Sequence, residues 1–153
     1  MDFTEFYPDS LYLSPAAPLY FLTLIRKAYL ASSGDPFFGD KFTGAWFHGF
    51  LYIELFFQFP LAAYLVWTLS SKTPSSGPTE LAGLAFGCLT GMGSVACLFE
   101  LLSMGPELVA DEHKNSLFWG TYFPFAIIPA IMALDMYTRL LRRVSNDVKP
   151  KTQ

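Results

Sequence analysis

An acidic and an amide side chain interrupt a long apolar stretch of the sequence. Glu54 and Gln58 lie within AWFHGFLYIELFFQFPLAAYLVWTL, residues 45–69. Residues four apart share one face of a helix, so the two side chains would form a single polar patch. A carboxyl group at membrane depth is costly and marks a functional site by default. We therefore expect a ligand contact; the alternative is a protonated Glu54 that only joins two helices by a hydrogen bond.

A second acid precedes this stretch, in the segment SSGDPFF. Asp35 stands directly before Pro36, the order of a helix N-cap followed by a first-turn proline, so capping alone is one interpretation. If this turn folds over the mouth of the bundle, Asp35 approaches Glu54. Two carboxyl groups in a poorly hydrated pocket cannot both ionise at low cost, so the pair would attract a cation such as an amine.

The sequence contains no recognisable motif for binding a metal ion or a cofactor. The two histidines, His48 and His113, lie far apart without thiol or acidic ligands at motif spacing. The two cysteines, Cys88 and Cys97, are nine residues apart in one apolar stretch, too far along a helix for a disulfide. We expect no metal, no cofactor and two packing thiols.

The overall composition is that of a membrane protein. The chain has 153 residues, of which 52% are hydrophobic and 15% charged, with a mean hydropathy of +0.34 and a net charge of −3. A soluble domain of this length carries nearer a quarter charged residues. The acidic balance and the lack of a basic run give no support to a nucleic-acid partner.

Three apolar runs are long enough to cross a bilayer: residues 45–69, 79–104 and 116–137. Polar segments at 70–78 and 105–115 separate them and predict a loop and a turn. Pro124 and Pro129 predict kinks in the last span, and the spacing of Asp135 and Arg139 predicts an exposed ion pair. The expected fold is all-α, a transmembrane bundle with three spans.

The distribution of basic residues predicts the orientation of the bundle. After the last span come Arg139, Arg142, Arg143, Lys149 and Lys151, whereas the loop before it has Lys114 alone. By the positive-inside rule the C-terminus is cytosolic, which places the segment before residue 45 on the lumenal side. The last five residues, KPKTQ, match a tail pattern for retrieval to the endoplasmic reticulum. We divide the chain into a transmembrane domain, residues 1–143, and a cytosolic tail, residues 144–153.

The segment before the first span contains a shorter helical pattern. Residues 15–31 carry apolar side chains at helical spacing, but Arg26 and Lys27 interrupt them. The segment is too short to span a bilayer comfortably, so we expect a helix lying along the lumenal interface.

Several motifs together resemble the sigma-2 receptor family. These are AWFHGFLYIELFFQFPL, TYFPFAIIP in the last span and YLASSGDPFF before the first span, and the resemblance runs from about residue 2 to residue 143. That family belongs to the EXPERA-domain membrane proteins, which include emopamil-binding protein, the sterol Δ8-Δ7 isomerase.

The resemblance implies a four-helix bundle in the endoplasmic reticulum with a membrane-open pocket for sterols and amphiphilic amines. It implies a role in sterol homeostasis or trafficking, with the lipid bilayer and either a second copy or a sterol-transport membrane protein as partners. In the matching motifs, Asp35 takes the place of the loop acid and Glu54 that of its hydrogen-bonding partner. The implied ligand-binding residues are Asp2, Tyr29, Asp35, Glu54, Gln58, Tyr122 and Phe125.

The sequence departs from the family pattern at two places. Asp2 matches the acid that ends the first family helix, yet only Met1 precedes it, so most of that helix is missing. We favour a chain truncated at its start over a three-span variant, because an unsealed polar pocket in lipid is costly. In the third family helix, Leu89, Gly93 and Ala96 stand where the family carries a histidine, threonines and a proline, which affects ligand specificity.

The leading hypothesis is a non-enzymatic membrane protein that binds sterols or amphiphilic amines in an acidic pocket, where Asp2 pairs with the ligand. One alternative is an isomerase, which needs a positioned acid and base. His48 does not share a helix face with Glu54 and so does not complete such a pair. The other alternative is a trafficking adaptor without a ligand.

Overall fold

The chain folds into helices joined by loops. A computed structural model describes residues 6–39, 44–71 and 74–148, and these residues form no strand. The main helices are α1 (Tyr20–Ser33), α2 (Ala45–Ile53), α3 (Phe59–Leu69), α4 (Gly77–Ser103), α5 (Asp111–Leu117) and α6 (Phe123–Val148). Two π-helical turns, η4 (Glu54–Gln58) and η5 (Phe118–Tyr122), join α2 to α3 and α5 to α6, and two short 3-10 turns are η2 (Asp9–Leu11) and η3 (Pro36–Phe38).

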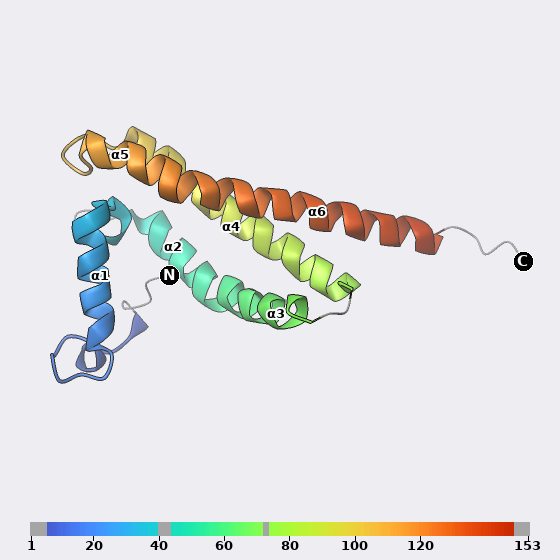
Figure 1. The fold of residues 1–153 in the computed structure, drawn as a ribbon, viewed down its shortest axis with the longest axis horizontal. Coiled ribbons are helices and arrows are strands. Elements are labelled where there is room, and N and C mark those ends of the chain that lie inside the picture. The colour runs from blue at the N-terminus through green and yellow to red at the C-terminus, as the bar shows by residue number, and fades with distance from the viewer. Residues whose placement is uncertain (1–5, 40–43, 72–73, 149–153) are drawn as a thin grey trace, which may run out of the picture.

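Three continuous helical segments are long and apolar enough to cross a membrane. They are Ala45–Leu69, Gly77–Ser103 and Asp111–Asn146. This confirms the predicted all-α fold with three spans. In Figure 1 these segments run in broadly the same direction, whereas α1 lies across them at the end of the bundle where α5 is found. The far end of α6 projects beyond the ends of α3 and α4.

Several predicted boundaries were wrong, by five residues at the start of two helices and by eleven residues at the end of the last helix. The first helix begins at Tyr20 rather than residue 15, and α5 begins at Asp111, inside the predicted polar turn 105–115. Asp111 and Glu112 in the first turn of α5 suit the positive end of the helix dipole. The last helix continues past the predicted end of the span at residue 137 to Val148, and the predicted pair of Arg139 with Asp135 forms at 2.8 Å.

Small residues allow α4 and α6 to pack closely, and they lie side by side over much of their length (Figure 1). Gly83, Gly87 and Gly91 of α4 are buried. A Cβ atom on Gly87 would lie 2.6 Å from the Pro129 carbonyl oxygen and 3.0 Å from the Ala133 side chain. In lipid, where helices gain nothing by hiding apolar surface from water, such close backbone contact provides much of the attraction.

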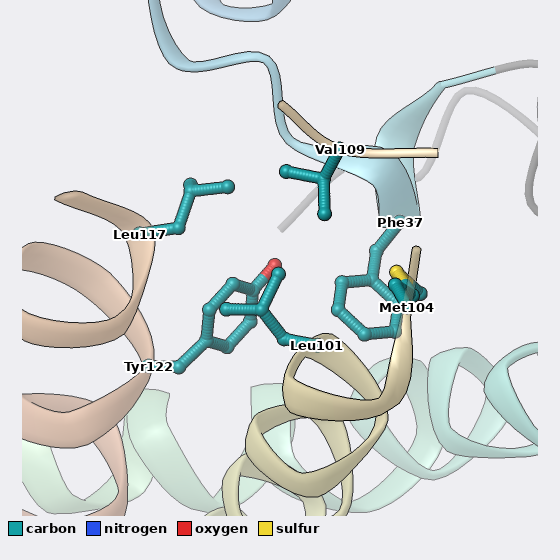
Figure 2. Packing of buried hydrophobic residues seen from close by; sticks show 6 residues of the cluster. All are labelled: Phe37, Leu101, Met104, Val109, Leu117 and Tyr122. Carbon is teal, nitrogen blue, oxygen red and sulfur yellow. The ribbon is translucent and has the colours of Figure 1, made fainter. Parts of the chain in front are cut away.

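A hydrophobic cluster closes the end of the bundle nearest α1 and α5. Figure 2 shows its buried members converging from α4, the loop that follows it, α5, η5 and the η3 turn. They are Phe37, Leu101, Met104, Val109, Leu117 and Tyr122. The phenol oxygen of Tyr122 emerges from this cluster toward the η3 turn, and this turn carries the first polar element of the candidate site.

Candidate functional site

Asp35 is the centre of a buried hydrogen-bond network. Its side chain is 1% exposed, and its Oδ1 accepts from the Phe37 main-chain N–H at 3.1 Å, which confirms the predicted capping role. The hydroxyl of Tyr29 donates to Oδ2 at 2.7 Å. The hydroxyl of Tyr122 lies 2.9 Å from Oδ1 and 2.7 Å from Oδ2. These contacts link the end of α1, the η3 turn and the η5 turn.

The network changes the acid–base behaviour of Tyr29. Burial of the phenol raises its pKa above the ordinary value of 10.0, and the hydrogen bond to Asp35 and the negative charge of that carboxylate raise it further. The phenol therefore remains protonated and continues to donate at every pH near neutrality.

A cavity of about 730 Å³ lies between α1, the first span, α4 and the η5–α6 segment. This volume is within the usual range for small-molecule sites, which are mostly apolar with a few placed polar groups. Its lining is mainly aromatic and aliphatic. The side chains with polar atoms that line it are Tyr7, Arg26, Tyr29, Glu54, Gln58, Thr90, Ser94, Cys97, Thr121 and Tyr122.

Glu54 and Gln58 both reach this cavity, at the two ends of the η4 turn. Gln58 is buried, and its Oε1 accepts from the Thr90 hydroxyl at 3.4 Å. Tyr52 is exposed on another face of the helix and does not line the cavity. The two residues thus form one polar patch inside the bundle, as their spacing predicted.

The expected hydrogen bond between Asp35 and Glu54 does not form. Both oxygens of Asp35 already accept from Tyr29, Tyr122 and the Phe37 N–H. Asp35 is behind the cavity wall, and the phenols that it holds line the cavity in its place. Among the residues that the structure describes, Glu54 is the carboxylic acid of the lining.

The structure brings together most of the predicted ligand-binding residues. Tyr29, Glu54, Gln58, Tyr122 and Phe125 all line the cavity. Phe125 is also largely exposed, at the open edge of the cavity. Asp2, predicted to pair with a ligand amine, lies outside the described residues.

Sequence reasoning missed other lining residues. Arg26 lines the cavity from α1, and its Nη2 donates to the Phe38 carbonyl at 2.8 Å. Three hydroxyl side chains also line it: Thr90 and Ser94 on α4, and Thr121 beside Tyr122. The hydroxyl groups of Ser and Thr in helices often donate to main-chain carbonyls of the same helix, so these residues alone do not indicate a binding site. Gly93 of α4 also lines the cavity.

A second polar cluster was not foreseen and lies away from the cavity, at the start of α4. Glu80 is buried, and its carboxylate accepts from Arg143 Nε at 2.6 Å and Nη2 at 2.9 Å. The Ser75 hydroxyl donates to the same carboxylate at 2.9 Å, and the Ser75 carbonyl accepts from Arg143 at 2.6 Å. The sequence did contain a signal for this pair: Glu80 lies at the start of the second span, and a cluster of basic residues follows the third span.

Comparison with known proteins identifies the family. The model of the EXPERA (EXPanded EBP superfamily) family matches residues 21–136. The chain is also 28% identical over 123 residues to "Efficient mitochondria targeting-associated protein 19" of Schizosaccharomyces pombe, a match that covers 79% of this chain and 60% of the relative. No solved structure matches. The family match covers most of the chain, including the first two spans and the larger part of the third, and the protein therefore belongs to the EXPERA superfamily of membrane proteins.

Proposed function

We propose that this protein binds a sterol or an amphiphilic amine in the cavity and serves sterol homeostasis or trafficking. The observation that supports this proposal is the mainly apolar and aromatic lining of this partly open cavity, with polar groups at Glu54 and Gln58. Apolar surface provides most of the affinity for such a ligand, while the few polar groups fix its orientation. Tyr29 and Tyr122, held by Asp35, provide further polar atoms at one end. The similarity to the sigma-2 receptor family supports the same ligand class.

A binding role is favoured over catalysis by the polar groups of the lining. An isomerase needs a general acid and a general base that both reach the substrate. In the described part of the lining, Glu54 supplies a carboxyl group and no histidine is present. His48 is exposed on α2 and does not line the cavity.

The test is equilibrium binding of labelled cholesterol and of a labelled amphiphilic amine to the purified protein in lipid nanodiscs. We expect saturable binding that weakens about tenfold in Glu54→Gln or Gln58→Leu, since each loses an orienting polar contact. Glu100→Gln is the matched control, because this acid is also on a span but does not line the cavity. Unchanged binding in both cavity variants would show that the polar patch does not hold the ligand. Conversion of a Δ8 sterol to a Δ7 product would overturn the non-enzymatic assignment.

A targeting role is the second candidate, because the yeast relative is named for efficient mitochondria targeting. The present chain spans 60% of the length of that relative, so a shared role is a proposal for the common region. If the protein has this role, cells that lack it should mislocalise a mitochondrial reporter. If the role does not depend on the cavity, a copy that carries both Glu54→Gln and Gln58→Leu should restore targeting. Failure of that copy to restore targeting would connect the role to the cavity.

We further propose an endoplasmic reticulum location with a cytosolic C-terminus. The basic run after the last span supports the orientation, and the similarity to the sigma-2 receptor family supports the location. A glycosylation acceptor placed after residue 153 should remain unmodified, while one placed in the loop near Glu107 should be glycosylated. The reverse pattern would overturn this orientation.

A further inference from the structure

Helix α1 forms one wall of the cavity but is hardly packed against the rest of the protein. Four of its residues line the cavity, at the spacing of one helix face: Leu22, Ile25, Arg26 and Tyr29. None of its fourteen residues is buried, whereas every membrane span contains buried residues. The neighbouring side chains Phe21, Leu24 and Ala28 are exposed. A helix with so few buried contacts belongs to the least stable part of a fold.

Two side-chain hydrogen bonds hold α1 at its C-terminal end. Tyr29 donates to Asp35 at 2.7 Å, and Arg26 donates to the Phe38 carbonyl at 2.8 Å. Toward the other end, Thr23 donates to the Tyr12 carbonyl at 2.9 Å, a partner in the segment that leads into α1. The bonds to the bundle side are therefore concentrated near residues 26–29.

A glycine lies where α1 meets this anchored end. Gly34 ends the helix in the left-handed conformation, with φ of 61°. A Cβ atom at this position would lie 3.0 Å from the ring of His113 on α5, so the junction is tightly packed. Glycine adopts this conformation without steric cost, which suits a pivot between a fixed turn and a moving helix.

We propose that α1 is a lid that opens and closes the cavity by rotating about Gly34. The inference rests on the cavity being the ligand site proposed above. Fourteen residues rise about 21 Å, so a rotation of roughly 20° moves the far end of α1 by about 7 Å. The hydrogen bonds of Tyr29 and Arg26 hold the closed position, and their loss lets the lid open.

Pulsed dipolar spectroscopy can measure this motion in a Cys97→Ser background. One spin label is attached through Leu24→Cys, on the exposed side of α1, and the other to Cys88, which is exposed on α4. We expect a major short-distance population and a minor longer one. Tyr29→Phe should enlarge the longer-distance population about tenfold, since it removes a hydrogen bond to a carboxylate. Tyr12→Phe is the matched control, because it removes a phenol bonded to Asp9 and keeps the carbonyl that Thr23 uses.

A reference pair on Cys88 and Ile128→Cys, on the closely packed α4 and α6, shows whether the bundle remains folded. If that pair is unchanged and Tyr29→Phe leaves the α1 distances as they were, the lid is overturned. Added cholesterol should enlarge the closed population in the unsubstituted background. A response to Tyr29→Phe without any binding of cholesterol supports the lid and counts against the proposed ligand. Cholesterol binding without any α1 motion supports the ligand and overturns the lid.

Discussion

Two phenols and one main-chain amide converge on the carboxylate of Asp35. A buried carboxylate is tolerated only when hydrogen bonds replace its lost hydration. Here Tyr29, Tyr122 and the Phe37 N–H provide them. The residue therefore positions two tyrosines at the cavity wall, and among the described residues the side chain that presents a carboxyl group to the cavity is Glu54.

Replacing Asp35 by asparagine should destabilise the fold by about 2–3 kcal/mol, because hydrogen bonds to a charged acceptor weaken and the new amide group faces phenol donors. Thermal unfolding of the protein in detergent micelles measures the change. Asp9→Asn is the control, since Asp9 is exposed and its carboxylate accepts from the Tyr12 hydroxyl; about 0.5 kcal/mol or less is expected. Equal effects of the two substitutions would contradict the central role of Asp35.

The pKa of Tyr29 predicts a loss of stability in alkali. The unfolded chain releases the phenol proton near pH 10, while the folded protein retains it to higher pH. Above pH 10 the unfolded state thus binds fewer protons, and stability falls as pH rises. Unfolding measured between pH 9 and 11 should show a shallower fall in Tyr29→Phe than in the unsubstituted protein. Parallel curves would show that this phenol titrates normally.

At the scale of the elements, both cavity-lining π turns stand just before a proline. The η4 turn ends at Gln58, two residues before Pro60, and the η5 turn ends at Tyr122, two residues before Pro124. Proline has no N–H and its ring clashes with the carbonyl four residues earlier, which disfavours a regular α-helix at that point, although α6 does continue through Pro129. The wider turn relieves the clash, and in each case its last side chain is buried at the cavity. Pi-helical turns occur often at functional sites.

The α4–α6 contact predicts the effect of adding one methyl group. Gly87→Ala would place a Cβ atom 2.6 Å from a main-chain oxygen, so the helices must separate, at a cost of about 1–3 kcal/mol. Gly49→Ala is a matched control within a helix, because its Cβ would meet nothing within 4 Å, and a small gain in stability is expected. Unfolding by sodium dodecyl sulphate compares the two. A neutral Gly87→Ala would contradict the close packing.

At the scale of the whole molecule, two polar clusters join helices that are distant in sequence. The Asp35 cluster connects the α1 end to the last span. The Glu80–Arg143 pair connects the start of α4 to the last part of α6, at the end near the α3–α4 turn. Between them the helices are held by apolar and small residues. The cavity lies beside α1 and the Asp35 cluster.

The Glu80–Arg143 pair predicts an asymmetry between its two partners. Arg143 is half exposed, so Glu80→Gln leaves a cation that water can solvate, whereas Arg143→Gln leaves a buried carboxylate without its partner. Arg143→Gln should therefore lower the midpoint of thermal unfolding by several degrees more than Glu80→Gln. The double variant should be closer to Glu80→Gln than to Arg143→Gln. Equal, additive shifts would indicate that the pair contributes little.

The spans and much of the site were predictable because membrane burial leaves a strong local signal. Apolar length predicted all three spans, and the i, i+4 spacing of Glu54 and Gln58 predicted one shared patch, although the π turn itself left no pattern that we recognised. Helix ends were less predictable: the polar residues 111–115 read as a turn but form the first part of α5. Their helical state depends on the apolar segment that follows them.

The amino-acid sequence by itself determined a three-span helical membrane protein, the costly polar residues within it and the cap at Asp35. Only the tertiary structure decided which groups meet. It directed the Asp35 oxygens to Tyr29 and Tyr122 instead of Glu54, and it paired Glu80 with Arg143, 63 residues away. The physical reason is range: hydropathy and capping depend on neighbours within a few turns, whereas hydrogen-bond partners depend on how the helices pack.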